Sequence, residues 1–150
     1  MAERHLTVRR HVDAPCARVW AVCADFPNLA AHWSGLKGSR PIGDQTYGLG
    51  ARRQVDLKPV GALVETVTAW EEGRTLATTN QPSALVPFKH ADARLTLEPD
   101  GHGTAITFDY RYVPRGGPMG RLTGPVIDRM LRTSFQSMLA AIDEAAISAG

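Results

Sequence analysis

The sequence has 150 residues, of which 43% are hydrophobic and 21% are charged, and its formal net charge is +2. This length and hydrophobic content predict one folded domain over residues 1–150 and exclude an intrinsically disordered chain. The near-neutral charge argues against a nucleic-acid partner, and no apolar run approaches the roughly 20 residues of a membrane span, so we expect no stable membrane insertion.

The compartment is inferred from the N-terminus and the cysteines. The first residues, Met1 to Val8, contain no apolar segment of a signal peptide. Cys16 and Cys23 fall on one predicted helix, where seven steps separate their α-carbons by roughly 10 Å, too far for a disulfide. Two free thiols fit a reducing compartment, so we predict a cytoplasmic protein.

The chain begins with a strand and a helix. Residues 4–13 alternate between apolar and polar side chains, which predicts a strand with one buried face. Pro15 is suited to the first position of a helix over residues 15–24, which carries an amphipathic stripe. The segment 25–28 ends this helix and starts a second short one that includes Trp33.

The middle of the chain is predicted to be all β. Turn signals recur between residues 36 and 115, and Asp100-Gly101 between two alternating runs indicates a β-hairpin. Short connections favour sequential antiparallel pairing. The candidate strands are residues 36–42, 49–57, 62–71, 74–80, 88–98 and 104–113.

A long helix is predicted at the C-terminus. After the break at 114–118, a broad apolar stripe of helical period continues to Ala146. Pro125 lies in its first turns and is expected to kink or split it. A sheet with one apolar face must bury that face, and this helix is the only predicted element large enough to cover it.

With this order of elements, the sequence resembles the polyketide cyclase/dehydrase and lipid-transport family of the START/Bet v1-like (SRPBCC) superfamily. The resemblance covers nearly the whole chain. It implies an α+β helix-grip fold: a curved seven-stranded antiparallel sheet with two short helices and a long C-terminal helix, enclosing a cavity for a lipid, sterol, polyketide or similar molecule. The residues that carry it are Val12-Asp13-Ala14-Pro15, Arg18-Val19-Trp20, Asp25-Phe26-Pro27-Asn28-Leu29, Trp33, Gly50-Ala51-Arg52-Arg53, Val67 to Glu71, Leu95-Thr96-Leu97 to Gly103-Thr104, and the helix from Gly120 to Leu139.

No standard catalytic, phosphate-binding or metal-binding signature is present, and the five histidines are scattered. We therefore expect no metal and no cofactor.

Inward-facing polar residues of the strands are better candidates for a ligand-binding site. Arg53 shares a face with Val55 and Leu57, so it either enters the cavity or reaches solvent from the strand end; inside, it needs a carboxylate such as Glu65 or a ligand anion. The strand 62–71 leaves open which face lines the cavity, the one with Glu65 or the one with Trp70.

Further candidate ligand-binding residues lie on the strands and the last helix. Tyr110 shares an apolar face with Phe108, and a buried tyrosine hydroxyl needs a ligand, backbone or water partner. Ala91 and Ala93 either leave room for a ligand or allow close approach of the helix. The resemblance places Trp33 at the cavity mouth. Met130, Ser134 and Met138 on the last helix either line the cavity or pack in the core.

Three functions compete. The first is a carrier or sensor that binds a small hydrophobic molecule, which needs only volume, an apolar lining and a few polar anchors. The second is a polyketide aromatase/cyclase-dehydrase that acts by shape and a few proton-handling residues, with Arg53, Tyr110 and His90 as catalytic candidates. The third is a regulatory role through a protein partner, which an exposed apolar patch would favour.

Overall fold

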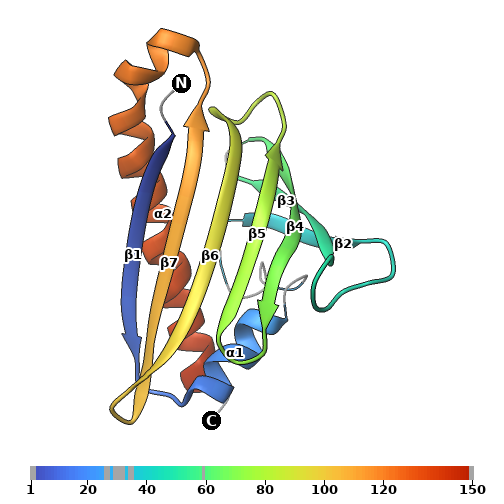
Figure 1. Cartoon of the computed structure of the whole chain (residues 1–150), viewed down its shortest axis with the longest axis vertical. Helices are drawn as coiled ribbons and strands as arrows, with labels where there is room; N and C mark the ends of the chain where they lie inside the picture. Colours follow the sequence, from blue (N-terminus) through green and yellow to red (C-terminus); the bar gives the residue numbers. More distant parts are fainter. Residues whose placement is uncertain (1–2, 26–27, 29–32, 34–35, 59, 149–150) are drawn as a thin grey trace.

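The computed structural model describes residues 3–25, 28, 33, 36–58 and 60–148, and its main feature is one curved antiparallel sheet (Figure 1). The strand order is β1-β7-β6-β5-β4-β3-β2, so only the pairing of β1 with β7 joins strands that are distant in the chain. The strands are β1 (Arg4–Val12), β2 (Leu36–Ile42), β3 (Arg52–Leu57), β4 (Ala62–Glu71), β5 (Thr75–Pro82), β6 (Phe88–Asp100) and β7 (Gly103–Pro114). The predicted seven-stranded sheet is confirmed.

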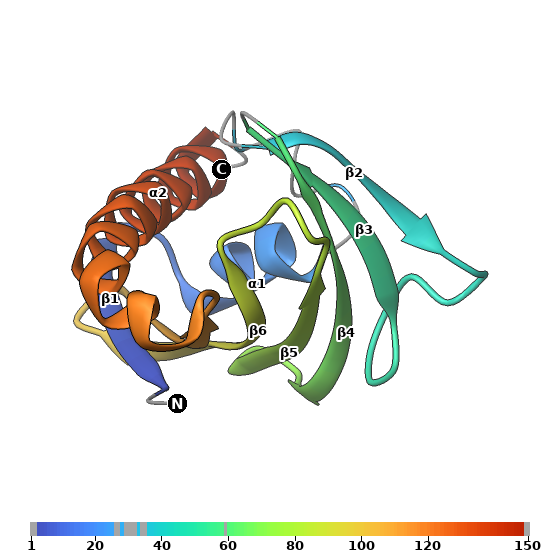
Figure 2. The same ribbon diagram turned by 90° about the horizontal axis from the view of Figure 1, so that it is seen from above.

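Within the described residues, two α-helices lie on the concave side of the sheet. Helix α1 (Cys16–Ala24) crosses one end, and α2 (Gly120–Ser148) runs along β1 and β7, preceded by the short 3-10 helix η2 (Gly117–Met119). Seen from above, the sheet curls away from α2 and leaves β3, β4 and β5 facing it across the interior (Figure 2). The helix-grip class predicted from the sequence is confirmed.

The helices differ from the prediction in detail. Pro15 is the N-cap of α1 rather than its first helical residue. Helix α2 is continuous through Pro125 and is not split there; the proline removes one backbone hydrogen bond near the start of a helix of 29 residues, and the rest of the ladder continues past it. The second predicted short helix falls mostly on residues 26–27, 29–32 and 34–35, which lie outside the described residues.

The β6–β7 hairpin forms as its sequence predicts. Asp100 pairs with Gly103, and Gly101 takes the positive φ of 62° that the tight connection requires. The end of β1 approaches this hairpin so closely that a Cβ atom at Gly103 would lie 2.3 Å from the carbonyl oxygen of Val12. Glycine at this position therefore lets β1 join the edge of the sheet beside β7.

The core lies between α2 and the β1–β7–β6 half of the sheet. Leu139 and Ile142 of α2 are almost fully buried against strand residues such as Val12 and Ile106. A polar clamp also joins the two layers: Arg4 Nε donates to Asp128 Oδ2 at 3.0 Å, and the Tyr112 hydroxyl donates to Asp128 Oδ1 at 2.5 Å. These contacts fix α2 over one half of the sheet.

Candidate ligand-binding cavity

A cavity of about 490 Å³ lies between α2 and the half of the sheet that the helix does not cover. This volume is within the range of small-molecule sites in proteins. Its walls come from every strand but β1 and from both helices. The lining described includes Cys23, Trp33, Leu36, Arg53, Val55, Leu57, Lys58, Val60, Leu63, Glu65, Leu76, Thr78, Asn80, Leu85, Val86, Pro87, Phe88, Ala93, Leu95, Phe108, Tyr110, Met130, Leu131, Ser134, Phe135, Met138 and Ile142.

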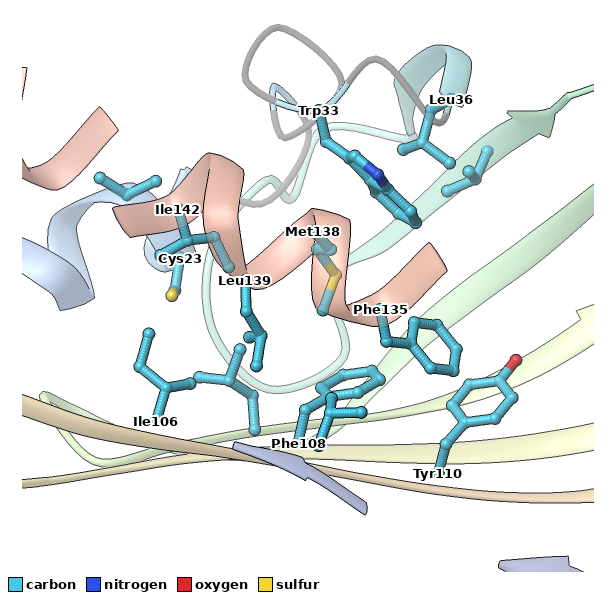
Figure 3. Close-up of a cluster of buried hydrophobic side chains, with 14 of the residues drawn as sticks. Cys23, Trp33, Leu36, Ile106, Phe108, Tyr110, Phe135, Met138, Leu139 and Ile142 are labelled. Carbon is cyan, nitrogen blue, oxygen red and sulfur yellow. The ribbon is translucent and has the colours of Figure 1, made fainter. Parts of the chain in front are cut away.

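Most of the lining is apolar. Figure 3 shows Phe135 and Met138 projecting from α2 toward Phe108 of the sheet, with Trp33 and Leu36 closing the space from another side. Phe135 lies 4.8 Å from the ring of Phe108, measured between ring centroids. An apolar lining of this kind favours ligands whose burial removes hydrocarbon surface from water.

A polar stripe crosses the cavity side of the sheet. Arg53 on β3 pairs in register with Glu65 on β4, which pairs with Asn80 on β5. Directly opposite residues of adjacent antiparallel strands share a face, so the three side chains stand side by side. All three line the cavity, where they interrupt an otherwise hydrophobic wall.

The first two members of the stripe form a buried ion pair. Arg53 Nη2 donates to both carboxylate oxygens of Glu65, at 3.1 and 3.2 Å, and Nη1 donates to Ser39 Oγ at 3.2 Å. The Arg53 side chain is 4% exposed and that of Glu65 15%. A charge is tolerated at such depth only when a paired and hydrogen-bonded countercharge offsets its desolvation.

Tyr110 adds a neutral hydroxyl next to this stripe. Burial, above all, raises its pKa, and the nearby Glu65 carboxylate raises it further, so the phenol keeps its proton at physiological pH. Thr78 donates a hydrogen bond to Asn80 Oδ1 at 3.1 Å, and the Asn80 side chain partly offsets the rise in the pKa of Tyr110. Polar groups of β5 and β7 therefore share the cavity wall.

Cys23 on α1 lies at one end of the cavity, and Trp33 lines the cavity beside Leu36. Trp33 is 8% exposed, and its indole Nε1 has no hydrogen-bond partner within the described part of the chain. Burial raises the pKa of the Cys23 thiol to about 12, so it remains protonated and behaves as a small apolar group.

The opposite end of the cavity opens to solvent. Val60, Leu85 and Met130 line the cavity and are each more than half exposed. They come from the β3–β4 turn, the β5–β6 loop and α2. An exposed apolar groove that includes Leu122 and Val126 continues from this mouth along the first turns of α2. This mouth offers a path between the cavity and the surface.

The comparisons with known proteins agree with this architecture. A family model described as "Polyketide cyclase / dehydrase and lipid transport" matches residues 3–146. The chain belongs to this family. Among curated proteins no match is found.

Solved structures share the fold of this polyketide cyclase/dehydrase and lipid-transport domain. TTHA0849 from Thermus thermophilus has a TM-score of 0.83 at 15% identity, covering 98% of this chain and 99% of that one. Ara h 8.0201 has a TM-score of 0.75 at 13% identity, with the same coverage. A protein from Nitrosospira multiformis has a TM-score of 0.73 at 19% identity, covering 94% of each chain.

Within the described residues, no helix is long and apolar enough to cross a membrane, and no group of three His, Cys, Asp or Glu side chains could hold a metal ion.

Family and fold identify a domain that binds a hydrophobic ligand, and most residues selected from the sequence lie along its cavity. The selected residues found in the lining are Trp33, Arg53, Glu65, Ala93, Phe108, Tyr110, Met130, Ser134 and Met138.

Three selected residues lie outside the lining. His90 is on the convex face, where its Nε2 atom lies 3.2 Å from Asp92 Oδ2. Ala91 is on the concave face but fully buried between its neighbours Asn80 and Tyr112, so it permits close packing and leaves no space. Trp70 packs at the α1 end, away from the cavity.

A β-bulge explains why the facing of β4 could not be read from its alternation. Leu63 and Glu65 face the cavity, but the register shifts between Val67 and Ala69. Trp70 therefore returns to the concave face opposite Leu76, where its Nε1 donates to Glu72 Oε2 at 2.9 Å. Both candidate faces of β4 thus contribute to the concave side, on either side of the bulge.

The polar cavity residues of β5 were not predicted. Thr78 and Asn80 line the cavity together with Leu76, and the three residues occupy every second position of the strand. This period-two pattern was available in the strand predicted over residues 74–80. The mouth residues Lys58, Val60, Leu85 and Pro87 lie in turns and loops, which carry no periodic signal.

Proposed function

We propose that this domain is a cytoplasmic carrier or sensor that holds one small hydrophobic molecule, such as a lipid or a polyketide, in the cavity beside α2. The observation that carries the proposal is a cavity of about 490 Å³ with largely apolar walls and a few convergent polar side chains. A cavity of this kind can bury most of a ligand's surface while the polar groups set its orientation. The two free thiols fit a reducing compartment.

The alternative is a polyketide aromatase/cyclase-dehydrase. Arg53 and Tyr110 both line the cavity, as such an enzyme requires. However, His90 faces the opposite side of the sheet, and burial raises the pKa of Tyr110, which makes it a poor proton donor near neutrality. Arg53 is already paired with Glu65. This arrangement supports binding better than proton transfer.

Native mass spectrometry of the purified protein, followed by denaturing extraction, tests the proposal directly. We expect either a stoichiometric co-purified apolar molecule or, for an empty protein, saturable binding of the neutral dye Nile red at one site. The proposal is wrong if the mass is that of the chain alone and Nile red shows no saturable binding. Turnover of an added poly-β-keto substrate would favour the enzyme instead.

Tryptophan fluorescence locates the bound molecule. Trp33 lines the cavity, whereas the indoles of Trp20 and Trp70 each donate to Glu72 at 2.9 Å outside it. A ligand in the cavity should change the emission of Trp33. We expect Trp33→Phe to lose most of this response and the matched variant Trp70→Phe to retain it. The opposite result would place the ligand elsewhere.

A further inference from the structure

We propose, resting on the proposed function, that the cavity selects an uncharged ligand whose oxygen accepts a hydrogen bond from Tyr110 beside the Arg53–Glu65 pair, and that it discriminates against carboxylates. The apolar walls already disfavour an ion, which loses its hydration there, unless a countercharge in the cavity offsets this loss. The distinction follows from the balance of charge along the polar stripe and from the direction of its hydrogen bonds.

The interior of the cavity has balanced charge. Among the described lining residues, Arg53, Glu65 and Lys58 carry full charges, and Lys58 is an exposed residue of the turn at the mouth. The guanidinium and the carboxylate inside are in direct contact, with Nη2 and Oε1 3.1 Å apart. A ligand carboxylate at this depth would lose its hydration and meet the Glu65 carboxylate, while an ammonium group would meet Arg53. A neutral polar group avoids both costs.

The Tyr110 hydroxyl lines the cavity and can donate a hydrogen bond into it. The neighbouring Asn80 already accepts from Thr78 at Oδ1, and its NH₂ group can only donate. The phenolic proton is therefore available to an acceptor oxygen of a ligand. Figure 3 shows the Tyr110 hydroxyl extending away from the sheet beside Phe135. Because the pKa of Tyr110 is raised, the proton stays in place to be donated to a ligand oxygen.

A matched pair of rigid ligands tests this selectivity. 9-Acetylanthracene and anthracene-9-carboxylate share one shape, but the first is neutral and the second anionic at pH 7.5. Their affinities are measured by displacement of bound Nile red from the full-length protein. We expect the ketone to bind at least tenfold more tightly than the carboxylate. Tyr110→Phe should weaken the ketone by about fivefold, the value of one net hydrogen bond, and leave 9-methylanthracene unchanged.

Substitution of Glu65 should reverse the preference. Glu65→Gln keeps a hydrogen-bonding side chain but removes the countercharge of Arg53, so we expect carboxylate affinity to rise at least tenfold. The double variant Arg53→Gln/Glu65→Gln restores neutrality and should lose this gain while it still binds the ketone. Lys58→Gln removes the cation at the mouth, and any carboxylate bound there would be lost in this variant.

The outcomes separate the two proposals. Equal or tighter binding of the carboxylate by the wild-type protein and by Lys58→Gln would overturn the selectivity, as would a ketone that fails to displace bound Nile red. Absence of any saturable Nile red binding by protein whose mass is that of the chain alone would instead overturn the proposed function itself. The wild-type comparison and Tyr110→Phe keep the selectivity testable even if Glu65→Gln does not fold.

Discussion

The concave face of the sheet has two halves that share one continuous register but are covered differently. The β1–β7–β6 half packs against α2 through large apolar residues such as Ile106 and Leu139. The β5–β4–β3 half carries Glu65, Thr78 and Asn80 and faces the cavity, which also extends over Ala93 of β6 and over Phe108 and Tyr110 of β7. We call the region packed against α2 the filled half, and the region that lines the cavity, including these residues of β6 and β7, the open half. The difference shows that one strongly curved sheet can hold its helix with half of its concave face and leave the other half for a ligand.

The largest expected effect comes from a matched pair of leucine truncations. Leu139 is fully buried in the filled half, so Leu139→Ala should destabilise the fold by about 2–5 kcal/mol in urea unfolding. Leu63 lies in the open half, where truncation enlarges an existing cavity instead of creating a new one. We expect Leu63→Ala to cost about 1–2 kcal/mol less. Equal costs would mean that the two halves are packed alike.

Two tyrosines on β7 sharpen the comparison. Tyr112 lies in the filled half, and its hydroxyl donates to the Asp128 carboxylate. Tyr112→Phe should therefore lower the free energy of unfolding by about 1.5–3 kcal/mol, because a hydrogen bond to a charged group is lost. Tyr110→Phe in the cavity should stay within about 1 kcal/mol of the wild type. Chemical unfolding at pH 7 measures both, and a reversed order would contradict the assignment of Tyr110 to ligand binding.

Two alanines on β6 test whether the space next to each half is filled by packed side chains or open to a ligand. Ala91 is fully buried between Asn80 and Tyr112, so Ala91→Leu should overpack the core and cost about 1–3 kcal/mol. Ala93 lines the cavity, so Ala93→Leu should leave stability nearly unchanged and weaken the binding of Nile red. Thermal unfolding and dye titration on both variants separate the two roles. Loss of stability in Ala93→Leu with unchanged dye binding would argue against the cavity.

Much of this division was accessible from the sequence because it rests on alternation. The spacing of Arg53 to Val55 indicated an inward side chain unless the strand end let it reach solvent, and Glu65 was one candidate partner; in the structure Arg53 is buried and paired with Glu65. Phe108 and Tyr110 on the cavity side of β7 were predicted in the same way. Period-two patterns define faces reliably wherever a strand pairs without interruption.

Non-local contacts determine what alternation could not predict. The bulge in β4 lies where another segment hydrogen bonds to it: Gly50 N donates to Val67 O, and Val67 N donates to Ala51 O. No local pattern in β4 records this contact, so the sequence left open which face of this strand lines the cavity, and Trp70 lies on the concave face outside the lining. Likewise, alanine at 91 and at 93 looks identical in sequence, and only the tertiary surroundings distinguish the fully buried Ala91 from Ala93, which lines the cavity.

The smallest expected effect lies on the sheet's edge, outside both halves, and depends on pH. The Asp100 carboxylate, 2.8 Å from His11 Nδ1, and then Asp13, 2.9 Å from Nε2, raise the pKa of His11 above its usual 6.5. A histidine with a raised folded-state pKa stabilises the fold fully below its unfolded pKa and loses this contribution as pH rises through the folded value.

We therefore expect the stability of the wild-type protein to fall, relative to that of His11→Gln, as pH increases from about 6.5 upward. The exposed pair is screened by salt, so the difference should shrink at high ionic strength. Urea unfolding of both proteins between pH 5.5 and 9, at low and high salt, measures this. Parallel pH profiles would show that His11 adds nothing to the edge, whereas a gap that opens at acid pH would show that the charged form of His11 holds β1 to the β6–β7 hairpin.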